Sequence, residues 1–165
     1  MINISELNEK KVSKKQIDVT LDVVELQDSY EKYTVLKPLK VIGELNSVGE
    51  IITLEGKVTG VLELTCSRCL KNFNYDIQLD INEKLTNNPE NKDDEIIFIN
   101  NDKLNLTEIV ENNIIMSLPI QRLCQEDCKG LCASCGSDLN LGECKCQHLN
   151  IDPRLAKLKD LFSND

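Results

Sequence analysis

The chain has 165 residues and a formal net charge of -9, with 41% hydrophobic and only 4% aromatic residues. This length suits one domain, or one domain with a small appendage, and its core must be built mainly from Ile, Leu and Val. The negative charge excludes nucleic-acid binding through bulk electrostatics, so any such contact must be local, and basic proteins are the more natural direct partners.

Predicted strands dominate the first part of the chain. Alternating or short continuous apolar patterns occur at residues 17–23, 41–45, 52–55, 62–65, 73–81 and 96–99. Such patterns are typical of strands with one or both faces buried. Residues 86–94 are polar and acidic without periodicity, which predicts a mobile loop. Two of the strands flank Cys66 and Cys69, so we expect this tract to form a hairpin turn that presents two sulfurs.

A change of period then predicts a helix over residues 106–118. Its apolar residues lie four apart, and Ile109 falls on the same face. Asn105 and Glu108 have the spacing of a variant capping box at the start of this helix. Pro119 is expected to end it.

A second, short helix is expected near the C-terminus, because Asp152 suits an N-cap and Pro153 suits the first turn. The order of elements predicts an α+β protein: a mostly antiparallel β-sheet or partly open barrel, then a helix, a Cys-rich zinc-binding segment and the short terminal helix. We expect a β-rich domain over residues 1–120, which holds the cysteine hairpin and one helix. Residues 121–165 would form the zinc-binding segment with the terminal helix packed on it.

The eight cysteines are the most informative residues of the chain, and all lie in two short tracts. They are Cys66 and Cys69, then Cys124, Cys128, Cys132, Cys135, Cys144 and Cys146. The first residues lack the pattern of a signal peptide, and no apolar stretch approaches membrane-spanning length, so we expect a cytoplasmic protein with no membrane partner. Thiols stay reduced there, so metal binding explains the cysteines better than disulfides do.

The spacing of the cysteines predicts one or two tetrahedral zinc sites per chain. Cys132-x-x-Cys135-Gly136 looks like a rubredoxin-type knuckle, in which the glycine lets backbone N–H groups turn toward the sulfurs. The favoured sites are Cys132, Cys135, Cys144 and Cys146 on the one hand, and Cys66, Cys69, Cys124 and Cys128 on the other. A single site with the other thiols free is the alternative, and His148 is an alternative ligand.

Enzymatic interpretations of the cysteines are weaker. Cys128, Cys132 and Cys135 have the spacing of a radical-SAM iron–sulfur motif, but too few residues follow them for the barrel of those enzymes. Cys66 and Cys69 would need to begin a helix to act as a thioredoxin-type pair, and strands flank them instead. The chain has one histidine and no Gly-rich phosphate loop. We therefore predict no enzymatic activity and no small-molecule substrate.

Four motifs occur together over roughly residues 15–162. They are a Cys-x-Arg-Cys-Leu turn at 66–70, the string Asp-Cys-Lys-Gly-Leu-Cys-Ala-Ser-Cys-Gly-Ser-Asp-Leu-Asn at 127–140, Cys144-x-Cys146, and Asp-Pro-Arg-Leu at 152–155. In combination they resemble the YceD family, which is named for accumulation of large-subunit ribosomal RNA. Members usually have proline where this chain has Ala133.

The resemblance implies a non-enzymatic factor that supports 23S ribosomal RNA accumulation and large-subunit biogenesis. Its partner would be ribosomal RNA or a basic large-subunit ribosomal protein. The alternative is a zinc-stapled protein-interaction module, or a chaperone for a basic ribosomal protein, without direct RNA contact. Arg68 lies between two cysteines on the predicted hairpin, so it is the predicted contact residue. Its other interpretation is that it balances the charge of the thiolates.

Overall fold

A computed structural model describes residues 2–4, 13–28, 31–91, 95–99 and 103–146. The sheet strands are β2 (Lys14–Leu21), β3 (Glu25–Gln27), β4 (Lys32–Val48), β5 (Ile51–Thr65), β6 (Asn72–Thr86) and β7 (Ile96–Phe98). The other elements are the short pair β1 (Ile2–Asn3) and β8 (Lys103–Leu104), the 3-10 turn η1 (Pro89–Asn91) and the helix α2 (Leu106–Ser117).

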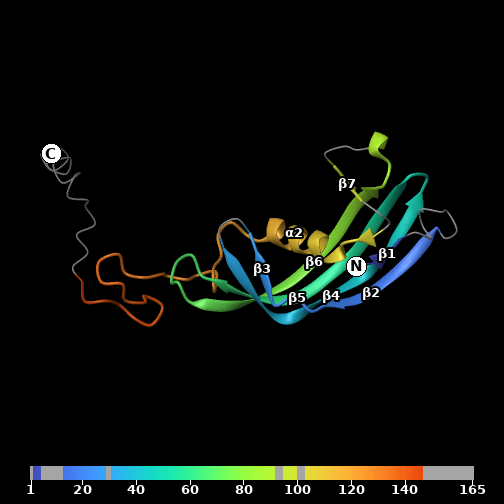
Figure 1. Cartoon of the computed structure of the whole chain (residues 1–165). Coiled ribbons are helices and arrows are strands. Elements are labelled where there is room, and N and C mark those ends of the chain that lie inside the picture. The colour runs from blue at the N-terminus through green and yellow to red at the C-terminus, as the bar shows by residue number, and fades with distance from the viewer. Residues whose placement is uncertain (1, 5–12, 29–30, 92–94, 100–102, 147–165) are drawn as a thin grey trace, which may run out of the picture.

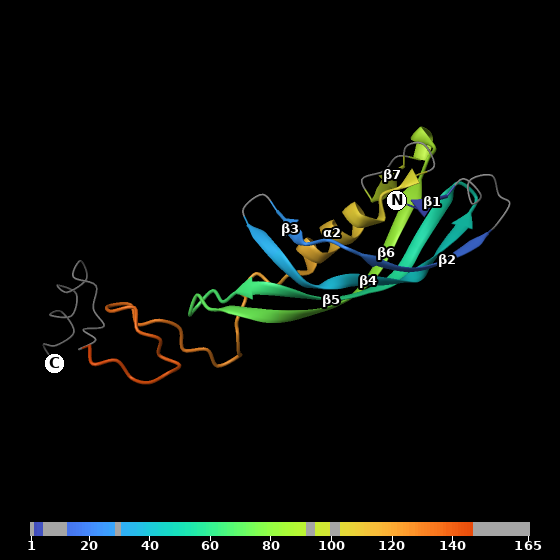
Figure 2. The ribbon, with the colours of Figure 1, turned by 60° about the horizontal axis from the view of Figure 1, so that its bottom comes forward.

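The six sheet strands form one curled sheet. Their order is β2-β4-β5-β6-β7, and β3 pairs with the first part of β4. All pairs in this sheet are antiparallel except β6 with β7, which is parallel. Figures 1 and 2 show that the sheet curls like half of a barrel, with α2 on its concave side. The Cys-rich segment, drawn in orange, extends from the end of the sheet where β5 turns into β6.

The expected fold class is confirmed only in part. The sheet is mostly antiparallel and partly open, as predicted, but the described residues are mostly strand with a single α-helix. The terminal helix predicted after Pro153 lies outside the described residues. In the part of the chain that the structure describes, no helix is both long enough and apolar enough to span a membrane.

The strands predicted at residues 52–55 and 62–65 are wrong as separate elements, because both belong to the single long strand β5. Gly56, which follows the first of them, faces Gly43 across the ladder between β5 and β4. A Cβ at Gly43 would lie 2.3 Å from the backbone oxygen of Glu55 and 2.5 Å from the Cα of Gly56. The glycines therefore permit a close backbone approach inside the sheet, and they do not end a strand.

Strand β4 is also much longer than the predicted strand at 41–45, and β3 was not predicted. The first part of β4 contains Pro38, which is normally a sign against a sheet interior. The register between β4 and β5 shifts twice between Val35 and Lys40, on either side of Lys37. Proline is tolerated at such an irregularity because its missing N–H is not needed by the ladder.

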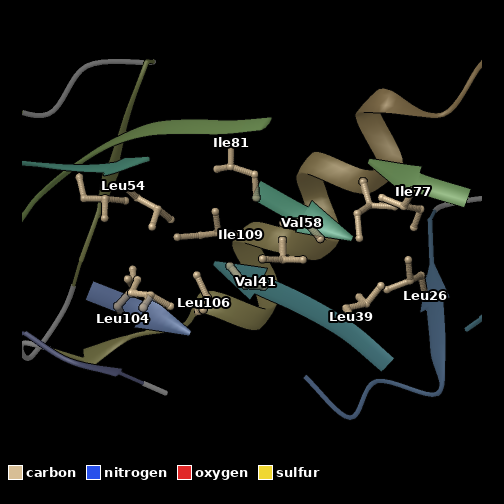
Figure 3. Close-up of a cluster of buried hydrophobic side chains, with 14 of the residues drawn as sticks. Leu26, Leu39, Val41, Leu54, Val58, Ile77, Ile81, Leu104, Leu106 and Ile109 are labelled. Atoms are coloured by element: carbon tan, nitrogen blue, oxygen red, sulfur yellow. The ribbon is translucent and has the colours of Figure 1, made fainter. Parts of the chain in front are cut away.

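The helix predicted over 106–118 is confirmed, and it seals the concave face of the sheet. Its buried residues are Leu106, Ile109, Val110 and Ile114. Figure 3 shows Leu106 and Ile109 among side chains of the long strands, such as Val41 and Val58. Full burial of one such side chain contributes about 1.5–3 kcal/mol, so α2 is held by this apolar contact rather than by its own propensity.

Of the two ends of α2, the C-terminal end is formed as predicted and the N-terminal end is not. Leu118 has φ -62° and ψ 135°, an extended conformation that proline imposes on the residue before it, so Pro119 ends the helix as predicted. The predicted capping box is wrong. The Asn105 amide donates to the carboxylate of Glu108 (3.0 Å), and no side-chain hydrogen bond caps the first turn.

Candidate metal centres

The fold brings the eight cysteine sulfurs into two groups of four, and within each group all sulfurs lie within 4.8 Å of one another. The inner group, next to the sheet, consists of Cys66, Cys69, Cys124 and Cys128. The outer group consists of Cys132, Cys135, Cys144 and Cys146. This is the grouping that the residue spacing favoured. His148, the alternative ligand, lies outside the described residues.

The turn between β5 and β6 presents the first two sulfurs of the inner group. The Cys66 N–H donates to the Lys71 carbonyl (2.9 Å), and the Leu70 N–H donates back to the Cys66 carbonyl (3.0 Å). The Arg68 N–H then points at the Cys66 sulfur, 3.5 Å away. The backbone of this knuckle therefore supplies a partial positive charge to a thiolate.

The outer group is built on the same knuckle. The Cys132 N–H donates to the Ser137 carbonyl (2.8 Å), the Gly136 N–H donates to the Cys132 carbonyl (2.8 Å), and the Ser134 N–H points at the Cys132 sulfur (3.4 Å). The residue after the second cysteine is left-handed in both knuckles. Gly136 has φ 71°, and Leu70 has φ 59° at the equivalent place. The sequence predicted a turn that presents two sulfurs at Cys66 and Cys69 as well, but only the outer group carries the glycine that marks this knuckle, and leucine rarely takes a left-handed conformation.

The sulfur geometry fits a tetrahedral metal ion. The sulfur–sulfur distances are 3.8 Å for Cys66–Cys128 and 3.6 Å for Cys69–Cys124 in the inner group, and 3.4 Å for Cys132–Cys144 in the outer group. Four sulfurs at about 2.3 Å from one zinc ion lie about 3.8 Å apart. Both groups are therefore close to the size that zinc needs.

The pKa values of the thiols also favour metal binding in both groups. The Ser137 hydroxyl lowers the pKa of Cys135 to about 6, whereas the hydrogen bond with Cys135, together with burial, raises the pKa of Cys146 to about 12. In the inner group, burial opposes ionisation of Cys66, but hydrogen bonds from backbone N–H groups prevail and lower its pKa to about 6. Burial, followed by the neighbouring thiols, raises the pKa of Cys124 to about 12. At least one thiolate thus forms readily in each group, and a dication would offset the repulsion that resists ionisation of the remaining thiols.

Arg68 lies at the junction of the two knuckles. Its guanidinium donates to the Cys128 carbonyl (2.8 Å), and its own carbonyl accepts from the Leu131 N–H (3.2 Å). Gly130 has φ 75°, and a Cβ there would lie 3.0 Å from the Arg68 oxygen. The link between the groups therefore passes directly over the first knuckle. The predicted contact residue also has a structural role, which the sequence suggested only as charge compensation.

A polar clasp, which the sequence did not reveal, joins the outer knuckle to the inner group. Lys71 forms an ion pair with Asp138 (2.5 Å), which lowers the pKa of that carboxyl. The Asn140 side chain accepts from the Lys129 N–H (2.7 Å) and donates toward the Cys128 sulfur (3.5 Å). Asp138 and Asn140 belong to the motif string at 127–140, and their place in that string was the only sequence feature that could have indicated this contact.

A second missed feature docks the Cys-rich segment on the sheet. The backbones of Ser67 and Arg122 meet through the Ser67 N–H and the Arg122 carbonyl (2.7 Å). The Arg122 guanidinium lies 4.9 Å from the Tyr33 ring centroid and donates a hydrogen bond to the Tyr33 hydroxyl (2.9 Å). It also forms an ion pair with Glu31. Burial and a hydrogen bond to Asp28 raise the pKa of Tyr33 to about 12. Sequence periodicity carries no signal for such a pair.

The fold and these sites define a class: a small β-sheet protein with two tetracysteine knuckle groups suited to structural metal. The model of the family described as "Large ribosomal RNA subunit accumulation protein YceD" matches residues 54–162, a span that contains both groups. The chain belongs to the YceD family, as its motifs predicted.

Similar proteins come from bacteria and from a plant. The uncharacterized protein YlbN of Bacillus subtilis is 25% identical over 153 residues, which is 91% of this chain and 89% of YlbN. An uncharacterized protein of Mycobacterium leprae is 28% identical over 133 residues, 78% of this chain and 61% of its own. A chloroplastic YCED homolog 1 of Arabidopsis thaliana, named for large ribosomal RNA subunit accumulation, is 22% identical over 188 residues, 95% of this chain and 56% of its own. No solved structure matches the chain.

Proposed function

We propose that this protein is a non-enzymatic factor of the cytoplasm that supports 23S ribosomal RNA accumulation and biogenesis of the large ribosomal subunit. The observation that carries the proposal is the match to the YceD family model over residues 54–162. That family and the Arabidopsis relative are named for accumulation of large-subunit RNA rather than for a reaction. The experiment that tests the proposal is deletion of the gene followed by measurement of the ratio of large to small ribosomal RNA.

The arrangement of the thiols supports a structural role for the metal. Each group offers four sulfurs to one ion. Four protein ligands close a tetrahedral site, whereas catalytic zinc sites keep one position for water or substrate. The proposed zinc ions would therefore fold and hold the Cys-rich segment, and they would not carry a reaction.

The first expected result is a colourless protein that holds two zinc ions per chain. Thiolate ligands in tetrahedral groups favour zinc over harder ions such as magnesium or calcium. Elemental analysis of protein purified under reducing conditions, together with an absorption spectrum, measures this. A brown protein with visible absorbance and stoichiometric iron would contradict the assignment of both groups to zinc.

Arg68 remains the proposed contact with RNA or with a protein partner. We expect Arg68→Glu to lower the ratio of large to small ribosomal RNA in cells while the protein keeps its folded level and its zinc. The physical reason is charge reversal on an exposed knuckle of a rigid hairpin. Lys57→Glu is the matched control, because Lys57 is an exposed residue within the sheet that pairs only loosely with Asp80 (3.4 Å).

A second variant distinguishes the structural role of Arg68 from its proposed contact with RNA or a protein partner. Arg68→Gln keeps an N–H donor for the Cys128 carbonyl but removes the charge. If Arg68→Glu loses zinc or folded protein while Arg68→Gln behaves as the wild type, Arg68 only supports the knuckle. Normal ribosomal RNA with an intact Arg68→Glu protein would remove this residue from the proposed contact.

The second candidate is a zinc-stapled interaction module, or a chaperone, for a basic ribosomal protein without direct RNA contact. The net charge of -9 favours it, because an acidic surface attracts a basic client. Crosslinking in cells, followed by sequencing of bound RNA and identification of bound protein, distinguishes the two. Crosslinks to protein alone would select this candidate.

A further inference from the structure

The inner group is mostly closed to solvent, because three of its four cysteines are buried and only Cys124 is partly exposed. Cys66, Cys69 and Cys128 are 0%, 4% and 1% exposed. Apolar side chains pack against these cysteines, namely Phe73, Leu123 and Leu131. The hairpin and the link over Arg68 cover the same group from the backbone side. A dissolved oxidant or chelator therefore meets side chains and backbone before it meets these sulfurs.

The outer group is open. Cys135 is exposed, and Cys144 and Cys146 are partly exposed. An open hollow of about 670 Å³ adjoins them, with these three cysteines, Ser137 and Gly142 in its lining. A small solute in this hollow reaches three of the four sulfurs directly. The two groups thus share one knuckle geometry but differ in access. Three sulfurs of the inner group are buried, whereas three of the outer group are exposed or partly exposed.

We propose that the outer group is a redox-labile zinc site, oxidised by small peroxides, while the inner group stays loaded. This inference rests on the proposed zinc binding. Susceptibility of a cysteine to oxidation follows thiolate character and accessibility. Zinc keeps the ligands of both groups as thiolates, so accessibility is the property that separates them.

The reaction balances with hydrogen peroxide as the oxidant. The Cys135 sulfur attacks one peroxide oxygen and breaks the O–O bond, which gives a sulfenic acid and hydroxide. The sulfur of Cys144 or Cys146 then displaces the second hydroxide and forms a disulfide. Two thiolates lose two electrons, one peroxide and two protons become two waters, and zinc leaves because two of its four ligands are gone. All four sulfurs lie within 4.8 Å, so only local adjustment is needed.

The test uses the full, zinc-loaded chain and hydrogen peroxide, with a chromogenic chelator to report zinc and peptide mapping to locate disulfides. We expect one zinc per chain to be released at least about tenfold faster than the other, with a disulfide confined to residues 132–146. Chelator without peroxide should release little zinc over the same time. Equal release of both ions, a first disulfide in the inner group, or equally fast release by chelator alone would overturn the inference.

A pair of matched leucine variants tests whether burial is the cause. Leu131→Ala removes part of the apolar cover of the inner group, and we expect it to speed release of the second zinc. Leu141→Ala removes an exposed leucine beside the hollow and should leave that release unchanged. Identical release curves for the two variants would contradict protection by burial. A chain that takes up no zinc would contradict the proposed zinc binding as well, whereas equal release contradicts this inference alone.

Discussion

Cys128→Ser should remove one zinc ion per chain and free the Cys-rich segment from the sheet. Cys128 is 1% exposed, its sulfur lies 3.8 Å from that of Cys66, and its carbonyl holds the Arg68 guanidinium. Metal binding contributes about 10–16 kcal/mol to folding of small zinc domains, more than the apolar contacts of this segment can replace. Hydrogen exchange should show loss of protection in residues 66–71 and 120–140, while β4 and β6 stay protected.

Cys135→Ser is the matched control, because it removes an exposed ligand from the outer group. It should also lose one zinc, but the loss of protection should be confined to residues 132–146. Residues 66–71 and 124–128 should remain protected, since the inner group is complete. The same exchange pattern in both variants would show that the two groups fold as one unit. Retention of two zinc ions in either variant would contradict the assigned ligands.

Gly43→Ala should destabilise the sheet by about 1–3 kcal/mol or more, the cost of overpacking a filled site. The new Cβ would lie 2.3 Å from the Glu55 oxygen and 2.5 Å from the Gly56 Cα. Both atoms are backbone, so β4 and β5 would have to separate at this point of the ladder. Urea unfolding followed by circular dichroism measures the change, as a lower midpoint with an unchanged slope.

Gly56→Ala is the control for this prediction. A Cβ at Gly56 would meet its nearest atom, the Ile42 oxygen, at 3.0 Å, so the neighbour must move by only a few tenths of an ångström. We expect a clearly smaller destabilisation than for Gly43→Ala. Equal midpoints for the two variants would show that the close approach of the strands at Gly43 does not determine how strongly alanine destabilises the sheet.

The amino-acid sequence by itself determined the features that depend on short spacing. The cysteine intervals predicted the outer group, because ligands a few residues apart can hold one ion. Cys124 and Cys128 were assigned to Cys66 and Cys69 by elimination, and only the fold brings these four sulfurs together. The helix at 106–118 followed from apolar residues four apart, and its end followed from Pro119. The motif string around Cys128 was specific enough to indicate the family.

Only the tertiary structure decided the features that depend on partners distant in sequence. From the sequence alone, Gly56 and Pro38 would each be expected to interrupt a strand. In the fold Gly56 lies opposite Gly43, and Pro38 lies where the register between β4 and β5 shifts, so both strands continue. The contact of Arg122 with Tyr33 joins residues 89 positions apart, and no local period records such a pair. Exposure of Cys135 and burial of Cys128 arise in the same way. Identical thiols in similar turns differ because Phe73, Leu123 and Leu131 pack against the inner group, whereas Cys135 lies beside an open hollow.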